Sequence, residues 1–141
     1  MFADSKSYGN LGSIAAARAT FLGWMKAFND RDIDALMSYY DVNIVVRPAT
    51  SSQVVGIEAV RAWLRSLLPS LTGTTMLYKE DFAFGGEDLA VLIGTFLFES
   101  SNGPGPAGRV ALTYRRDGRG EWKLVFDVDN NPPDASLELF R

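Results

Sequence analysis

Apolar residues recur with the period of an α-helix through most of the first half of the chain. Behind Ser13, which we take as an N-cap, one apolar stripe runs to about residue 29 and contains Ile14, Ala17, Phe21, Trp24, Met25 and Phe28. A short second stripe follows the capping residue Asp32, and a third covers residues 57–68, ahead of Pro69. The pattern predicts three helices in the first half and a loose segment over the first ten residues.

From about residue 74 the spacing changes to the alternation that is typical of β-strands. We expect a short strand at 44–46, stopped by Pro48, and longer strands at 74–84, 89–99, 109–116 and 122–130. The links GGED, SNGPGPAG and DGRGE read as turns and suit antiparallel hairpins. Helices followed by an antiparallel meander predict an α+β fold, with the helices packed on one face of a curved sheet.

The last strand, in the stretch KLVFDVDNN, splits into two rows of side chains. One row is apolar and contains Trp122, Leu124, Phe126 and Val128. The other contains Val125, Asp127 and Asp129. Two interpretations stay open: the acids line a pocket and the apolar row is an interface, or the acids lie at a frayed strand end and the apolar row is the core.

The amino-acid composition excludes several classes of function. The chain has 141 residues, enough for one domain with a core, and a net charge of −3, which provides no long-range attraction for nucleic acid or anionic lipid. It has no cysteine and no histidine, which excludes thiol nucleophiles, histidine-based triads and zinc hydrolase sites within the chain. Acid–base chemistry must therefore use carboxylates, tyrosines, lysines or water.

The sequence also predicts where the protein acts and which cofactors it lacks. The polar start has no signal-peptide pattern and no apolar run is long enough to cross a bilayer, so we expect a cytoplasmic protein without membrane contact. The glycine-rich stretches lack a following helix and a lysine, so we expect neither nucleotide nor other cofactor. We expect no bound metal either.

Four stretches in order resemble the nuclear transport factor 2-like superfamily, in its SnoaL-like and ketosteroid-isomerase-like branch: AFNDRDIDALMSYYDVNIVVRP, GIEAVRAWL, GEDLAVLIGTF and YRRDGRGEWKLVFDVDNN. The resemblance covers about residues 14–131. It implies a cystatin-like cone, in which a strongly curved, mostly antiparallel sheet wraps three N-terminal helices around a pocket. We therefore expect a flexible N-terminus at 1–12, one domain at 13–131 and a C-terminal tail at 132–141.

Most catalytic residues known from this superfamily have no equivalent in this sequence. Matching positions place Arg47 where ketosteroid isomerases have their carboxylate base, before Pro48, and Trp24 and Leu112 where they have their oxyanion hole. We therefore expect no ketosteroid isomerase activity. The histidines of SnoaL-type cyclases and scytalone dehydratases are missing, and the acid–arginine–acid set of limonene-type epoxide hydrolases matches only in chemical type.

The resemblance also implies which side chains face the pocket. Val125, Asp127 and Asp129 point inward, with Arg47 at the rim, and without a nearby arginine burial raises the pKa of at least one acid. The expected aromatic walls are Trp24, Phe28, Tyr40, Trp63 and Tyr114, with Tyr39 and Tyr78 as further candidates. The apolar row Trp122, Leu124, Phe126 and Val128 then forms a homodimer interface on the convex face.

Three functions stay open at this level. The first is a small-molecule-binding domain that holds an apolar or aromatic ligand. The second is a cofactor-independent hydrolase, isomerase or cyclase that acts through Asp127, Asp129 and Arg47. The third is a protein-assembly domain, which we expect to fill its concave side and leave no ligand-sized cavity.

Overall fold

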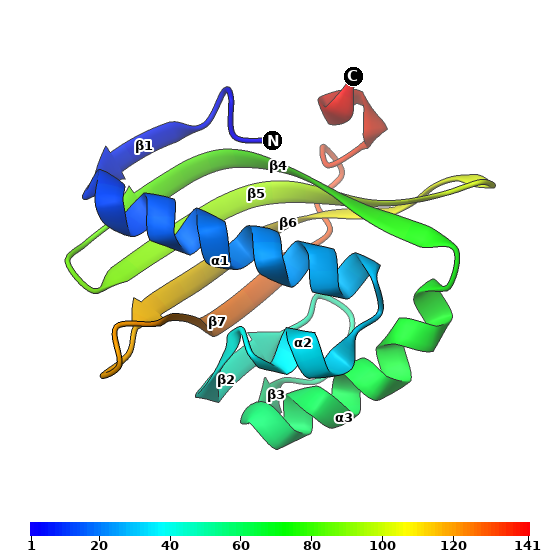
Figure 1. The fold of residues 1–141 in the computed structure, drawn as a ribbon. Coiled ribbons are helices and arrows are strands. Elements are labelled where there is room, and N and C mark those ends of the chain that lie inside the picture. The colour runs from blue at the N-terminus through cyan, green and yellow to red at the C-terminus, as the bar shows by residue number, and fades with distance from the viewer.

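A curved seven-stranded sheet packs against three helices in the computed structural model, which describes residues 1–141 (Figure 1). The sheet order is β1-β4-β5-β6-β7-β2-β3, and all neighbours are antiparallel except the parallel pairs β1–β4 and β2–β7. The helices are α1 (Leu11–Asn29), α2 (Ile33–Met37) and α3 (Ile57–Leu67), with 3₁₀ turns η1 (Leu68–Leu71) and η2 (Leu137–Phe140). The strands are β1 (Lys6–Gly9), β2 (Tyr40–Arg47), β3 (Val54–Val55), β4 (Thr74–Gly85), β5 (Leu89–Ser100), β6 (Gly103–Arg116) and β7 (Trp122–Asn130). The predicted α+β architecture is confirmed.

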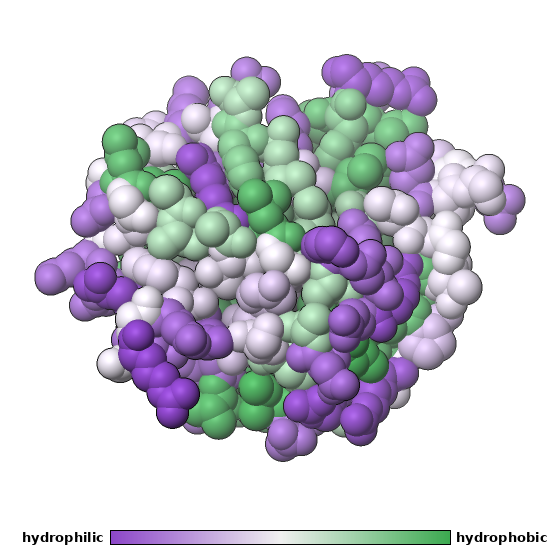
Figure 2. Space-filling view, viewed as in Figure 1, coloured by the Kyte–Doolittle hydropathy of each residue, from purple (hydrophilic) through white to green (hydrophobic).

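Helix α1 crosses the concave face of the sheet, while α2 and α3 lie beside β2 and β3 (Figure 1). The predicted stripe of α1 supplies much of the core, because Ile14, Ala17, Phe21 and Phe28 are all buried. Seen from the same side, hydrophilic residues gather around the rim of the molecule, with paler residues over its middle (Figure 2). None of the helices combines the length and the apolar character that crossing a membrane would require.

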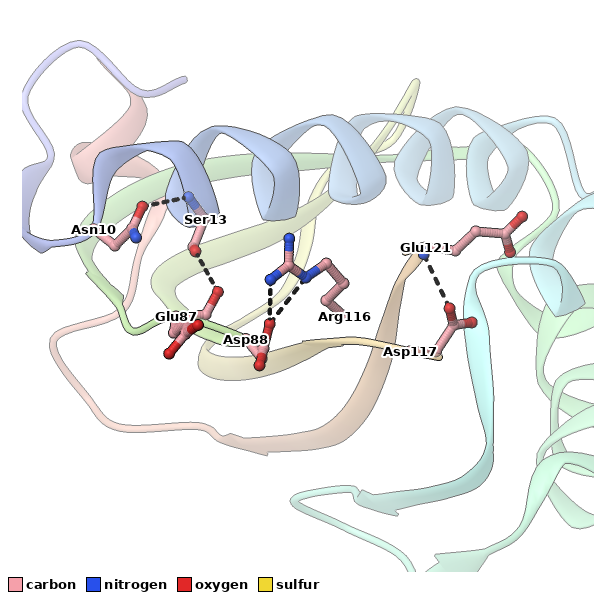
Figure 3. A network of polar contacts seen from close by, with 7 residues as sticks. All are labelled: Asn10, Ser13, Glu87, Asp88, Arg116, Asp117 and Glu121. Atoms are coloured by element: carbon pink, nitrogen blue, oxygen red, sulfur yellow. Dashed lines mark hydrogen bonds and ion pairs between the residues drawn. The ribbon is translucent and has the colours of Figure 1, made fainter. Parts of the chain in front are cut away.

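The start of α1 differs from the predicted one. Asn10 is the N-cap, and its side-chain oxygen accepts a hydrogen bond from the backbone N–H of Ser13 at 3.0 Å. Ser13 instead donates its hydroxyl to the carbonyl of Glu87 at 3.2 Å, which ties the helix to the β4–β5 turn (Figure 3). A serine and an asparagine are about equally good caps, so local sequence did not separate the two positions.

Two segments expected to be irregular are strands. Residues 6–9, within the predicted flexible N-terminus, pair with residues 82–85 of β4 as the parallel edge strand β1. Most of the predicted loop SNGPGPAG belongs to β6, because Gly103 and Pro104 already pair with Ser100 and Glu99. In both cases a neighbouring strand supplies the hydrogen bonds, which short-range sequence patterns do not show.

Strand β7 contains the irregularity that decides the site. Thr113 of β6 pairs with Phe126, but the next residue, Tyr114, pairs with Leu124, so Val125 has no partner on β6. This β-bulge shifts the alternation of side chains by one residue. Before the bulge Leu124 points into the core, where it is 1% exposed, and Trp122 packs against the same core. The prediction that Trp122 and Leu124 face outward is therefore wrong.

After the bulge, the side chains of β7 point to the faces that were predicted from the sequence. Asp127 pairs with the buried residues Leu112 and Val46, and Asp129 pairs with Val110, all on the concave side. Phe126 and Val128 lie on the opposite, convex side. The bulge thus allows one strand to supply core residues at its start and acids to the concave face at its end.

Candidate functional site

A cavity of about 390 Å³ lies between the concave face of the sheet, α1 and α3. Fifteen of its 22 lining residues are hydrophobic, which suits an apolar ligand. Its aromatic lining residues are Phe21, Trp24, Phe28, Tyr40, Trp63, Tyr78, Phe96 and Phe98. Residues 48–51, which follow β2, complete the wall beside the acids.

The aromatic side chains form a continuous packed wall. Trp24 stacks on Phe28 with ring centroids 5.0 Å apart, and Phe28 contacts Phe98 at 6.1 Å. At the other end Phe21 lies 4.4 Å from Tyr78. Such pairs hold each other in place, so the wall is set before any ligand arrives.

Asp127 borders this apolar cavity without a countercharge. Its carboxyl has no hydrogen bond or ion pair with the rest of the protein, and burial raises its pKa to about 7, with a further contribution from Asp129. Glu80, also on the concave face and only 1% exposed, is different because Arg18 binds it at 2.5 Å. Glu80 is buried and paired within the protein, whereas the partly buried carboxyl of Asp127 has no partner in it.

Asp129 joins the cavity to the loop after β2. Its Oδ1 accepts a hydrogen bond from the backbone N–H of Ala49 at 2.6 Å. Burial raises the pKa of Asp129, and the Ala49 hydrogen bond opposes that rise. The acid at the strand end therefore holds residues 48–51 against the cavity.

Two tyrosines, Tyr40 and Tyr114, lie near Asp127 on the concave side. Tyr40 accepts a hydrogen bond from Nε1 of Trp24 at 2.9 Å, and burial raises its pKa, with Asp127 adding to the effect. Burial raises the pKa of Tyr114 as well, again with a contribution from Asp127. These shifts show that both phenols stay protonated at neutral pH and lie within electrostatic reach of the acid.

Tyr78 carries the one tyrosine hydroxyl in this region that is buried without a hydrogen-bond partner. Its ring lies across Gly94 of the neighbouring strand, where a Cβ atom would overlap the phenol. The missing side chain at Gly94 therefore allows Tyr78 to extend over β5 toward Tyr114.

Several predicted site residues do border the cavity: Trp24, Phe28, Tyr40, Trp63, Asp127 and Asp129. Of the two further candidates, Tyr78 borders it and Tyr39 does not. Tyr114 is buried behind its lining, and Val125 is the bulge residue and does not line it. Whether any of these side chains binds a ligand or takes part in catalysis is still a prediction.

Arg47 does not lie where it was expected. It pairs with Val128 on the convex side of the sheet and donates its Nε–H to Gln53 at 2.7 Å. Side chains alternate between the two faces along β2, so Arg47, which follows the buried Val46, points to the other face of the sheet. An acid–arginine–acid set with Asp127 and Asp129 is therefore not formed.

Sequence reasoning missed a group of lining residues on the central strands: Met76, Phe96, Phe98 and Val110. Leu112, which the family match placed at an oxyanion-hole position, lines the cavity as well. Their strands carry apolar residues on both faces, so alternation alone did not show which face is concave. Gly94 was a usable signal, because a glycine within a strand often marks the close approach of another group. No cluster of three or more acidic side chains is close enough to hold a metal ion.

The convex face carries two apolar rows that cross four strands. Register places Phe84, Val91, Thr113 and Phe126 in one row, and Phe82, Ile93, Ala111 and Val128 in the other. Phe82 and Phe84 are 40% and 43% exposed. An apolar surface of this extent is unusual on a protein that stays monomeric.

Comparison with known proteins identifies the fold. A family model described as a SnoaL-like domain matches residues 21–125. An NTF2-like protein of unknown function from Pseudomonas putida KT2440 superposes with a TM-score of 0.77 at 24% identity, over 94% of each chain. A ketosteroid isomerase-like protein from Erwinia carotovora atroseptica SCRI1043 gives 0.70 at 17% identity, over 84% of this chain and 95% of that one.

A further similar structure is an NTF2-like protein with a cystatin-like fold from Novosphingobium aromaticivorans. Its TM-score is 0.74 at 17% identity, over 91% of this chain and 86% of that one. No protein of curated function matches the chain by sequence. At these identities the structural likeness shows the cystatin-like fold and leaves the function to be argued from the site.

Proposed function

The chain belongs to the SnoaL-like domain family, and from that premise we propose that it binds an apolar or aromatic small molecule in its concave cavity, anchored at Asp127. The observation that carries the proposal is an apolar cavity of about 390 Å³ with a carboxyl group that the protein itself leaves unpaired. The cavity also favours binding over the protein-assembly function, for which we expected a filled concave side.

Displacement of Nile red, a neutral apolar dye, tests the binding proposal. Val110→Trp should fill the cavity and abolish dye binding, because Val110 lines it on β6. Thr75→Trp adds the same side chain at an exposed position on β4 and should leave dye binding unchanged. Equal dye binding by the wild type and Val110→Trp would contradict the proposal, and native mass spectrometry of the freshly purified protein would identify a co-purified ligand directly.

A second candidate function, cofactor-independent acid–base catalysis, is favoured by the pKa of Asp127. A carboxyl group with a pKa of about 7 in an apolar cavity exchanges a proton readily near neutral pH. Arg47 has no part in this form of the proposal, since it lies on the convex side. Ketosteroid isomerase activity stays predicted absent, because Arg47, Trp24 and Leu112 stand at the positions matched to that chemistry.

The variant Asp127→Asn distinguishes a catalyst from a protein that only binds its ligand. If the protein is a catalyst, this variant should lose turnover of a substrate found by native mass spectrometry, by roughly 100-fold or more, while still binding it. If it is only a binder, no turnover is present to lose.

We also propose that two copies pair through the convex rows described above. Phe126 and Val128 keep their predicted place in this interface, and Phe82, Phe84, Val91 and Ile93 replace Trp122 and Leu124. Burying these side chains between two copies removes apolar surface from water, which is the main driving force of association.

A further inference from the structure

The cavity carries negative charge with no positive charge to balance it. Asp127 and Asp129 both border it, and no lysine or arginine does. Three arginines of neighbouring elements pair with acids outside the cavity: Arg18 with Glu80, Arg109 with Asp134 at 3.0 Å, and Arg115 with Asp41 at 3.1 Å. A ligand that carries an anionic group would meet two acids and no partner, so the charge distribution selects against anions.

The two acids of the cavity are suited to accept hydrogen bonds. The other polar side chains that border it, Tyr40, Thr50, Ser51, Tyr78 and Asn131, are uncharged. An ionised carboxyl only accepts hydrogen bonds. Asp127 and Asp129 therefore offer acceptors to a group that has several donors and no acceptor, which describes an ammonium ion.

The aromatic walls add to the same preference. Trp24 borders the cavity from α1 and Trp63 from α3, with Phe28 and Tyr40 beside Trp24. The negative face of an indole or phenol ring attracts a cation, most strongly where water is excluded. Apolar walls exclude water and hold the hydrocarbon part of such a ligand at the same time.

We propose that the ligand of this cavity is an apolar amine, bound as its ammonium form at the carboxyls of Asp127 and Asp129. The inference rests on the proposed binding function and names its ligand class. A bound ammonium ion supplies the countercharge that Asp127 lacks.

Three probes with one hydrocarbon skeleton test the charge preference: 2-naphthylmethylamine, 2-naphthylmethanol and 2-naphthoate. Their affinities are measured at neutral pH by displacement of Nile red. The amine should bind about tenfold or more tightly than the alcohol, which corresponds to about 1.4 kcal/mol, and the carboxylate should bind most weakly.

Variants assign the preference to the cavity acids. Asp127→Asn should bring the affinities of amine and alcohol close together. Asp88→Asn removes the same charge at an exposed acid paired with Arg116 (Figure 3), and should leave the preference intact. If Asp88→Asn weakened the preference as much as Asp127→Asn did, a general surface-charge effect would replace the proposal.

The two proposals fail in different ways. If the alcohol displaces the dye and the amine binds no better, the amine inference is overturned while small-molecule binding stands. If the carboxylate binds as tightly as the amine, the inference is overturned as well. If neither the dye nor any of the three probes binds, both proposals are overturned.

Discussion

The two halves of β7 show how one strand serves two purposes. Before Val125 the strand places Leu124 among buried side chains, where any polar group is costly. After Val125 it sends Asp127 to a cavity and Phe126 to the opposite, convex surface. A single extra residue separates the stabilising half from the half that carries the candidate chemistry, in keeping with the frequent place of bulges next to active sites.

Leu124→Arg should have the largest effect of any change that tests this contrast. Leu124 is 1% exposed in the core, so an arginine there buries an unpaired charge and should cost more than about 4 kcal/mol, enough to unfold most of the protein. Far-UV circular dichroism and thermal unfolding measure the loss. A folded Leu124→Arg protein would mean that the first half of β7 faces outward after all.

Phe126→Arg should leave the fold intact and separate the dimer. Phe126 lies on the convex side, two positions from Leu124 in sequence, so the same substitution meets a different environment. Light scattering coupled to size-exclusion chromatography should find dimers of the wild type and monomers of the variant, with closely similar circular dichroism spectra. Dimers that persist in Phe126→Arg would contradict the proposed interface.

Asp127→Asn should stabilise the protein at alkaline pH. The pKa of Asp127 is raised from 3.8 to about 7 on folding, so its contribution to stability is fully present below about pH 4 and is lost as the pH rises toward 7. Asparagine stays neutral and does not suffer this loss. We expect a gain of roughly 2–4 kcal/mol at about pH 8 and little gain at about pH 4.

Chemical denaturation of wild type and Asp127→Asn at both pH values measures this difference. Asp88→Asn, at an exposed acid, serves as the control and should show no comparable pH-dependent gain. A variant that is destabilised at both pH values would indicate that the carboxyl group of Asp127 makes structural contacts.

Asp129→Asn should have the smallest effect, on the titration of its neighbour. The charge of Asp129 is the second cause of the raised pKa of Asp127, after burial, so removing it should lower that pKa. Carboxyl carbon chemical shifts, followed by NMR across the titration, report the change. A pKa of Asp127 that rises in this variant would show that the two acids do not interact as described.

The helices and most strands were predictable because their signals are local. The α1 stripe, the cap at Asp32 and the hairpin turns act within a few residues, and Asp32 does accept the capping hydrogen bond from Ala35. β1 and the first residues of β6 were missed because their stability depends on strands far along the chain. Of the site, Asp127, Asp129 and five aromatic side chains were found, and Arg47 was misplaced.

The amino-acid sequence by itself determined which chemistry is possible. Without histidine or cysteine, acid–base work falls to carboxylates and phenols, and the apolar periods set the order of helices and strands. Only the tertiary structure decided which face of each strand is concave. Alternation defines two faces of a strand but not what surrounds each face. Pairing with β7 placed Arg47 on the convex face, and the bulge at Val125 turned Asp127 to the concave face. Packing then left the carboxyl of Asp127 without a countercharge.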